Sequence, residues 1–213
     1  MKVKTPDNYE ARSLQGTVEV RKREDGGATI RGIAAVFDSL SENLGGFREQ
    51  IAPGAFTDTD MLDVRGLFNH DANFVLGRTT SKTVRLKQTN RGLEYEIDLP
   101  DTATIRDLVL APIERGDVDQ SSFGFIVGPG NDSWDEDAEG RMIRTIRKVA
   151  ELFDVSPVTF PAYRDTTVGA RSMNDWQSIQ SELAAQAKAE LDERKKRAVQ
   201  IENFERRAEL PGK

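Results

Sequence analysis

The stretch DQSSFGF sets two adjacent serines, Ser121 and Ser122, against a Phe-Gly-Phe run, and either hydroxyl group could serve as a nucleophile. Side chains alternate between the two faces of an extended strand. Ser121 therefore shares a face with Phe123 and Phe125, whose bulk marks that face as core. Ser122 shares the other face with Gly124, which has no side chain, so a substrate backbone could come close to the hydroxyl group. Ser122 is the better candidate nucleophile, and Ser121 is expected to be its buried, hydrogen-bonded neighbour.

A serine hydroxyl group needs a base that takes its proton, and the base needs a third group that orients it. His70 is the only histidine of the chain, so an imidazole base must be this residue. It lies in GLFNHDANFVLGRT, just past an apolar strand and in a polar turn, where a scaffold can hold a side chain toward solvent and substrate. The residues alone leave open the commoner alternative, a lone surface histidine in a turn.

Two acids in VAELFDVSPVTF, Glu151 and Asp154, are candidates for the third group. By strand alternation Asp154 shares a face with Leu152 and Ser156. Aspartate is disfavoured in strands, and an acid among apolar residues suggests a specific hydrogen-bonding role, which favours Asp154. The alternative is an acid at a strand end that caps a turn before Pro157.

The surroundings of Ser122 do not match the G-x-S-x-G elbow of α/β-hydrolases, because Gln120 stands where the first glycine would be. The order His, Ser, Asp along the chain also differs from the orders of the chymotrypsin, subtilisin and α/β-hydrolase triads. Periodicity alone does not choose among these interpretations.

Composition narrows the function further. The 213 residues suffice for one well-cored domain plus an appendage, and the net charge of -6 argues against sequence-independent nucleic-acid binding. The expected partners are proteins. The chain has no cysteine and one histidine, which excludes disulfides and thiol nucleophiles and argues against a zinc site; no metal or cofactor is implied. No apolar run is long enough to cross a bilayer, and the N-terminus lacks the apolar core of a signal peptide, so the chain is expected to stay in the cytoplasm.

The elements that must position these residues are mostly strands. LQGTVEVRKRE and ATIRGIAAVF flank a DGG turn and predict a hairpin, and DVRGLFNH, TVRLKQT and LEYEIDL are further strand candidates. A short helix is expected around AFTDTD, and a clear one in DTATIRDLVLAPIERGD, where Gly116 is a stop signal and Pro112 could kink or shorten it. The acid-rich GPGNDSWDEDAEG is expected to be a long mobile hairpin loop. Many strands and few helices predict a mainly β (α+β) core, a closed or strongly curved β-barrel flanked by helices.

The composition changes near Arg171. From Asn174 the chain is rich in Ala, Glu, Lys, Gln and Arg, with a thin apolar stripe at helical spacing, which predicts a long C-terminal helix. We therefore expect a core at 1–171 and a helical C-terminal arm at 172–213 that docks on a partner or on itself. A solvated helical tail without a specific partner remains the alternative.

Four blocks of the sequence bear a resemblance to a known family: RGIAAVFDSLSENLGGFREQIAPGAF, LFNHDANFVLGRT, IERGDVDQSSFGF and ELFDVSPVTFPAYRDTTV. They follow one another in the order seen in the prohead proteases of tailed bacteriophages, which are capsid maturation serine proteases. The match runs from Arg31 to Val168. The resemblance implies a fold related to the herpesvirus assemblin proteases, a β-barrel flanked by helices, with the stretch 1–171 as the protease core.

The same resemblance implies roles for single residues. His70 matches the family histidine of an N-H-D block, and Ser122 matches the serine of an S-F-G-F block. Asp154 stands where many relatives have glutamate, and assemblins have a second histidine in that role; being one methylene shorter, Asp154 must reach the imidazole from a nearer backbone. The alternative acid, Glu151, is not excluded by the sequence.

An oxyanion hole is also implied. In assemblins a loop after the third catalytic residue contributes to it, so PAYRD with Tyr163 and Arg164 is the candidate for oxyanion or substrate binding, together with Gly124 beside the serine. The alternative for PAYRD is a turn that merely closes the barrel.

The function implied by the resemblance is a serine endopeptidase that cleaves the scaffolding protein, or a scaffold-like segment of the major capsid protein, and itself. It would act in the cytoplasm of the bacterial host, inside the assembling procapsid, with possible self-association. The C-terminal arm would then assemble with scaffold helices. The alternative, from another class, is a noncatalytic capsid assembly or scaffold-binding protein.

Overall fold

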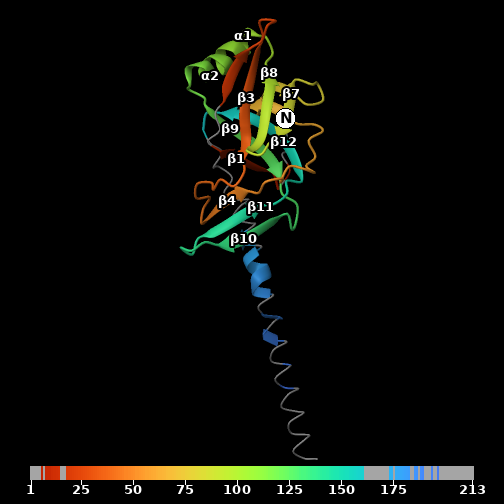
Figure 1. Ribbon diagram of the computed structural model, residues 1–213, viewed down its shortest axis with the longest axis vertical. Coiled ribbons are helices and arrows are strands. Elements are labelled where there is room, and N and C mark those ends of the chain that lie inside the picture. The colour runs from red at the N-terminus through yellow and green to blue at the C-terminus, as the bar shows by residue number, and fades with distance from the viewer. Residues whose placement is uncertain are drawn as a thin grey trace, which may run out of the picture. The chain divides into compact units, whose positions relative to one another are not determined.

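The computed structural model describes residues 6, 8–14 and 18–160 and, in the C-terminal part, residues 173–174, 176–182, 185–186, 188–189, 193 and 196. By compactness the chain divides into two units, residues 1–169 and 170–213. All the strands and helices with defined bounds belong to the first unit (Figure 1).

A five-stranded sheet with the order β1-β9-β12-β5-β6 runs through the centre of this unit. β9 is antiparallel to both β1 and β12, β12 is parallel to β5, and β5 and β6 form an antiparallel hairpin. Its strands are β1 (Glu10–Leu14), β9 (Gln120–Ile126), β12 (Glu151–Val158), β5 (Arg65–Phe68) and β6 (Asp71–Arg78).

Two smaller sheets complete the strand inventory of the described residues. The four-stranded sheet is antiparallel throughout, with the order β2-β3-β8-β7, and its β2–β3 pair confirms the hairpin predicted around the DGG turn. Its strands are β2 (Glu19–Lys22), β3 (Ala28–Val36), β8 (Gly92–Asp98) and β7 (Val84–Gln88). The three-stranded sheet, order β10-β11-β4, consists of β10 (Asp132–Glu136), β11 (Met142–Ile146) and β4 (Phe47–Ile51), with β11 and β4 parallel.

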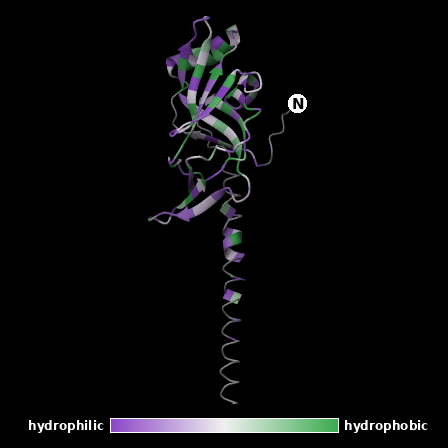
Figure 2. Ribbon diagram, turned by 45° about the vertical axis from the view of Figure 1, so that its right-hand side comes forward, coloured by the Kyte–Doolittle hydropathy of each residue, from purple (hydrophilic) through white to green (hydrophobic). Residues whose placement is uncertain are grey.

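The apolar core takes side chains from the five-stranded and the four-stranded sheets together. Along the strands of Figure 2, hydrophobic positions alternate with hydrophilic ones, as expected for sheets that bury one face. Fully buried members of the cluster include Ile30, Leu93, Ile97, Phe123, Phe125 and Val155. β9, which carries the serine pair, is buried on both faces except at its ends.

One helical segment lies beside one end of β3 (Figure 1). It consists of α1 (Ala103–Ile105), a π-helical turn η1 (Arg106–Leu110) and α2 (Ala111–Arg115), and it ends at Gly116 with φ +80°. This confirms the predicted helix and its stop signal. The wide turn η1 comes just before Pro112, which lacks an N–H group and crowds the preceding turn of a regular α-helix, so the widening relieves the contact.

The predictions of a closed or strongly curved β-barrel and of a long C-terminal helix are wrong. The described strands form three open sheets whose edge strands are β1 and β6, β2 and β7, and β10 and β4, so no cylinder of paired strands closes among them. No helix with defined bounds lies in the described part of the C-terminal region, where the longest run of described helical residues is 176–182, and the α-helices delimited elsewhere are short. Ile179 of the predicted apolar stripe is 54% exposed, so at this position the chain lacks the packing from which helices in proteins take most of their stability. The rest of the predicted arm lies outside the described residues.

Two smaller predictions are also wrong. Residues 53–58 form turns instead of a short helix. The acid-rich stretch contains strand β10, because Trp134 is buried with its ring centroid 5.0 Å from that of Phe47 and Asp132 forms an ion pair with Arg144. None of the helices that the structure describes is long and apolar enough to span a membrane.

Candidate active site

His70, Ser122 and Asp154 meet at one point of the five-stranded sheet. His70 Nε2 lies 2.6 Å from Ser122 Oγ, and His70 Nδ1 lies 2.6 Å from Asp154 Oδ1. Ser122 is fully buried, and the side chains of His70 and Asp154 are 18% and 5% exposed. Hydroxyl, imidazole and carboxylate therefore form one hydrogen-bonded line.

A tight hairpin turn carries the imidazole. Phe68 at the end of β5 pairs with Asp71 at the start of β6, so only Asn69 and His70 connect the two strands. Both have φ of +56°, as a two-residue type I′ turn requires at its central positions. Residues other than glycine seldom adopt this conformation, and asparagine and histidine are among those that adopt it most often. The turn therefore fixes where the His70 side chain projects.

Asn69 ties this turn to the end of β12. Its N–H donates to the carbonyl of Pro157 (3.1 Å), its Oδ1 accepts from the backbone N–H of Thr159 (2.8 Å), and its Nδ2 donates to Thr159 Oγ1 (3.2 Å). Because Asp154 lies on the same strand, these bonds hold the imidazole and the carboxylate in one frame. Sequence reasoning missed this role, although an Asn at a predicted turn was a usable signal.

The two serines lie on opposite faces of β9. Ser121 is fully buried, with its Oγ 2.9 Å from the hydroxyl group of Tyr95, whereas Ser122 faces His70. Burial raises the pKa of Tyr95 well above its usual value, and the hydrogen bond with Ser121 offsets this only in part. Ser121 is thus held in a neutral hydrogen bond in the core.

Asp154 reaches the site through a β-bulge. In the pairing of β12 with β9, Leu152 is opposite Phe125 and Asp154 is opposite Gly124, so Phe153 is an extra residue. The bulge breaks the alternation, so the expectation that Leu152 and Asp154 share a face is wrong: Leu152 joins the apolar core, while Asp154 lies on the face of Ser122.

Both carboxylate oxygens of Asp154 accept further hydrogen bonds. Ser156 Oγ donates to Oδ1 (2.8 Å), and the hydroxyl group of Tyr9 donates to Oδ2 (2.8 Å) and lies 3.4 Å from His70 Nδ1. The alternative acid, Glu151, is exposed. Ser156 could have been found from its position two residues after Asp154, on the same strand face. Nothing in the sequence signalled Tyr9.

Gly124 makes room for this arrangement. A Cβ atom at this position would come within 2.1 Å of the Tyr9 hydroxyl oxygen and 2.3 Å of Asp154 Oδ2. The space beside the glycine is therefore filled by Tyr9 and Asp154, whereas the sequence suggested room for a substrate backbone. The other two candidates for oxyanion or substrate binding, Tyr163 and Arg164, lie outside the described residues.

Strand β1 lies directly against the serine. Ser13 is opposite Ser122 in the antiparallel pair, and Ser122 Oγ donates a hydrogen bond of 2.9 Å to the carbonyl oxygen of Arg12. The backbone of β1 thus covers the hydroxyl group.

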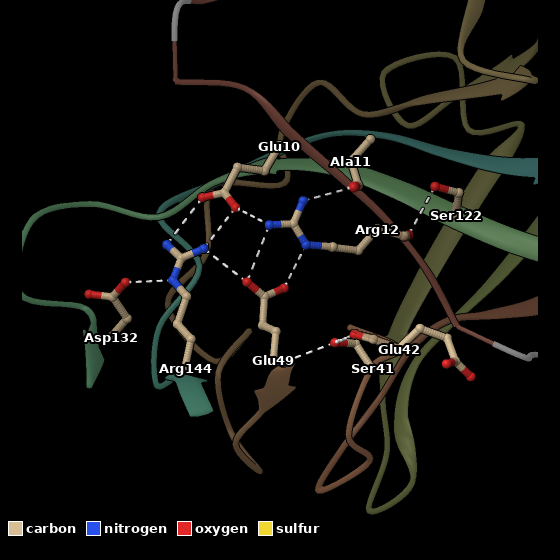
Figure 3. A network of polar contacts seen from close by, with 9 residues as sticks. All are labelled: Glu10, Ala11, Arg12, Ser41, Glu42, Glu49, Ser122, Asp132 and Arg144. Carbon is tan, nitrogen blue, oxygen red and sulfur yellow. Dashed lines mark hydrogen bonds and ion pairs between the residues drawn. The ribbon is translucent and has the colours of Figure 1, made fainter. Parts of the chain in front are cut away.

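A cluster of buried, charged side chains connects β1 to the neighbouring strands (Figure 3). Arg12 contacts both Glu10 and Glu49, at 2.5 and 2.7 Å, and Arg144 contacts the same two acids, at 2.8 and 2.9 Å. Asp132 completes the cluster through Arg144, at 2.6 Å. Burial alone would raise the pKa of Glu49, but the charges of Arg12 and Arg144 outweigh it and hold the pKa below its usual value. Within the described residues, no group of three or more His, Asp or Glu side chains could hold a metal ion.

A serine hydroxyl, an imidazole and a buried carboxylate in one hydrogen-bonded line have the geometry of a serine hydrolase site. The model of the family described as Caudovirus prohead serine protease matches residues 16–179. The chain belongs to this family, and it is accordingly a phage capsid maturation protease. The matched residues include His70, Ser122 and Asp154 and begin after β1.

Among solved structures, the capsid assembly protease of bacteriophage T4 matches with 11% sequence identity and a TM-score of 0.43, covering 70% of this chain and 97% of that one. A comparison with curated protein sequences found no match.

Proposed function

We propose that the chain is a serine endopeptidase in which Ser122 is the nucleophile, His70 is the general base and Asp154 orients the imidazole. The observation that carries the proposal is the pair of 2.6 Å contacts that His70 makes, through Nε2 to Ser122 Oγ and through Nδ1 to Asp154 Oδ1. Family membership and the absence of a second histidine support it.

The steps follow from these contacts. Nε2 of His70 takes the hydroxyl proton as Ser122 Oγ attacks the peptide carbonyl, and returns it to the leaving amine. The imidazolium that forms donates through Nδ1 to Asp154, whose negative charge stabilises it. Bonds from Ser156 and Tyr9 keep that carboxylate in position.

The developing oxyanion needs backbone N–H donors. Gly124, Tyr163 and Arg164 stay predictions for oxyanion or substrate binding. Gly124 is the described member of the three, and its close packing against Asp154 favours a steric contribution.

The proposed substrates are the scaffolding protein or a scaffold-like segment of the capsid protein, and the chain itself, cleaved inside the assembling procapsid in the host cytoplasm. The support is the family, whose members act on proheads. Self-association and the division into a core at 1–171 and a C-terminal arm at 172–213 also stay predictions.

The test compares wild type, Ser122→Ala and Ser121→Ala by intact-mass analysis over time, each expressed alone and with scaffold and capsid proteins. Fragments are expected from wild type and Ser121→Ala and none from Ser122→Ala. Ser121→Ala is the matched control: it removes the neighbouring hydroxyl group and leaves that of Tyr95 without its partner, at a cost of about 1–3 kcal/mol in stability. Intact chains in all three samples, even in assembled shells, would refute the catalytic proposal and favour a noncatalytic assembly protein.

A further inference from the structure

The nucleophile is closed off by a segment of its own chain. Ser122 is fully buried, although an attacking hydroxyl group must reach a peptide carbonyl. β1 lies along the edge of β9 that would otherwise be free, with Ser13 opposite Ser122. An extended peptide that brings its backbone to Ser122 along this edge would need the place that β1 occupies.

β1 also competes with the base for the proton of the serine. The hydroxyl group of Ser122 has a single proton, and both His70 Nε2, at 2.6 Å, and the carbonyl oxygen of Arg12, at 2.9 Å, are within hydrogen-bond distance of Oγ. A proton donated to Arg12 is withheld from His70. Since it is the carbonyl oxygen, and not the carbon, that faces Oγ in this bond, β1 is bound without being attacked.

Tyr9, just before β1, closes the other side of the site. Its hydroxyl group binds Asp154 Oδ2 at 2.8 Å, and its ring centroid lies 5.9 Å from that of Phe153. The segment from Tyr9 to Ser13 therefore contacts the nucleophile and the carboxylate and lies within reach of the base.

The side chains that hold β1 are charged, and they point away from Ser122. Glu10 and Arg12 are opposite Phe125 and Phe123 of β9, on the face that does not carry the serine. There they meet Glu49 of β4 and Arg144 of β11, which are themselves register partners. Figure 3 shows the two acids and two arginines interleaved beneath the β1 backbone. If β1 left, Glu49 and Arg144 would keep their contact of 2.9 Å with each other, but Glu49 would lose its cationic partner on β1 and Arg144 its anionic one, so each could accept a replacement.

We propose that β1 is an intramolecular inhibitor bound in the peptide site, and that the site takes an extended peptide with an acidic residue followed two positions later by a basic one. The proposal rests on the proposed serine endopeptidase function. The acidic side chain takes the place of Glu10 against Arg144, and the basic one takes the place of Arg12 against Glu49. The family match beginning at residue 16 supports the separation of β1 from the catalytic core.

The test measures how fast a fluorophosphonate labels the full-length chain. In this reaction Ser122 Oγ forms a bond to phosphorus, fluoride leaves, and the hydroxyl proton passes to His70. The variant Glu10→Gln/Arg12→Gln removes the charges of β1 and keeps its backbone. Its matched control, Arg23→Gln/Asp25→Asn, removes an exposed ion pair of 3.1 Å in the β2–β3 turn. The labelled residue is identified by peptide mass mapping.

Labelling of the β1 variant is expected to be about tenfold or more faster than that of wild type, because the reagent reaches Ser122 only in molecules in which β1 has left the edge of β9. The control variant should be labelled at the rate of wild type. The peptide of residues 6–14, PDNYEARSL, should slow the variant again, while PDNYRAESL, with acid and base exchanged, should not. Equal rates for wild type and the folded β1 variant, or equal effects of the two peptides, would overturn the inference.

If the β1 variant shows no cooperative thermal transition, and is therefore not folded, the test uses the effect of the two peptides on the labelling of wild type. PDNYEARSL in excess should slow its labelling by competing for the opened edge, and PDNYRAESL should leave the rate unchanged. If Ser122 is labelled and neither peptide changes the rate, the inference about β1 is wrong, while the proposed protease function is not contradicted. An absence of labelling at Ser122 in every sample, with or without peptide, contradicts the proposed function itself.

Discussion

His70 Nδ1 lies 2.6 Å from Asp154 Oδ1, although 84 positions separate the two residues in the sequence. The parallel pairing of β5 with β12, with Arg65 opposite Asp154, makes this contact possible. It places the β5–β6 turn, which carries His70, beside the C-terminal end of β12. The site is therefore a product of strand topology, and its parts can be tested separately.

Replacement of Asp154 by Asn should lower kcat/KM for peptide hydrolysis by about 10⁴-fold, because an amide can donate to Nδ1 and so favour the wrong imidazole tautomer. Glu151→Gln is the matched control, because Glu151 is exposed at the start of the same strand. The measurement is steady-state hydrolysis of a peptide from the scaffold or capsid substrate. A comparable loss in Glu151→Gln, with Asp154→Asn active, would reassign the orienting acid.

Gly124→Ala should reduce both stability and activity. The added methyl group meets the Tyr9 hydroxyl oxygen and Asp154 Oδ2, so one of the two must move, at a cost of about 1–3 kcal/mol in the free energy of unfolding. Urea denaturation and peptide hydrolysis report the two effects. In the double variant Tyr9→Ala/Gly124→Ala part of the loss in stability should be recovered, and strictly additive effects would show that the methyl group does not press on Tyr9.

Asn69→Gly should lower kcat while leaving KM nearly unchanged, because it removes the side-chain bonds to Thr159 that hold the His70 turn. Glycine tolerates the φ of +56° at this position. Asn69→Ala loses the same bonds and adds about 1–2 kcal/mol of left-handed strain. The predicted order of stability in urea is wild type, Asn69→Gly, Asn69→Ala; equal stability of the two variants would contradict the turn conformation.

The buried cluster should make stability depend on pH through Glu49. Its pKa is lowered in the folded protein, so its contribution is fully present above the unfolded value of about 4.3 and is lost as pH falls through the lower folded value. The groups that face it are Arg12 from β1 and Arg144 from β11, with Glu10 and Asp132 bound to the same arginines.

Glu49→Gln should therefore cost about 3–5 kcal/mol at neutral pH, because it leaves buried arginine charge uncompensated. The difference from wild type should be constant above pH of about 5 and should shrink below about 4. Denaturant titrations from pH 3 to 7 give the comparison, and a difference independent of pH over this range would show that the fold does not lower the pKa of Glu49, since only a pKa that differs between the folded and unfolded states makes stability depend on pH.

Local pattern was enough to predict the parts of the site that depend on one strand or one turn. The alternation SSFGF separated Ser122 from Ser121, and the polar turn after an apolar strand located His70. Alternation failed in β12, since one extra residue at Phe153 changes the face of Leu152 and a bulge leaves no mark in the hydrophobic pattern.

The sheet architecture and the charge cluster could not be predicted in the same way. The number of strands is equally compatible with a barrel and with three open sheets. Whether a sheet closes depends on which strands pair, and many of these pairs are far apart in the sequence. In the sequence, Arg12 and Arg144 look like ordinary surface arginines. They are buried only because β1, β4 and β11 come together in the fold. Tyr9 likewise reaches Asp154 across 145 positions.

The two-residue connection between β5 and β6 has a consequence for how this part of the chain can vary. Surface loops usually accept insertions, since an added residue costs little and touches nothing else. Here one residue added between Asn69 and His70 would change the turn type and rotate the imidazole away from both of its partners. Length variation among natural or engineered versions of this chain should therefore be excluded from this hairpin, even though it lies at the surface.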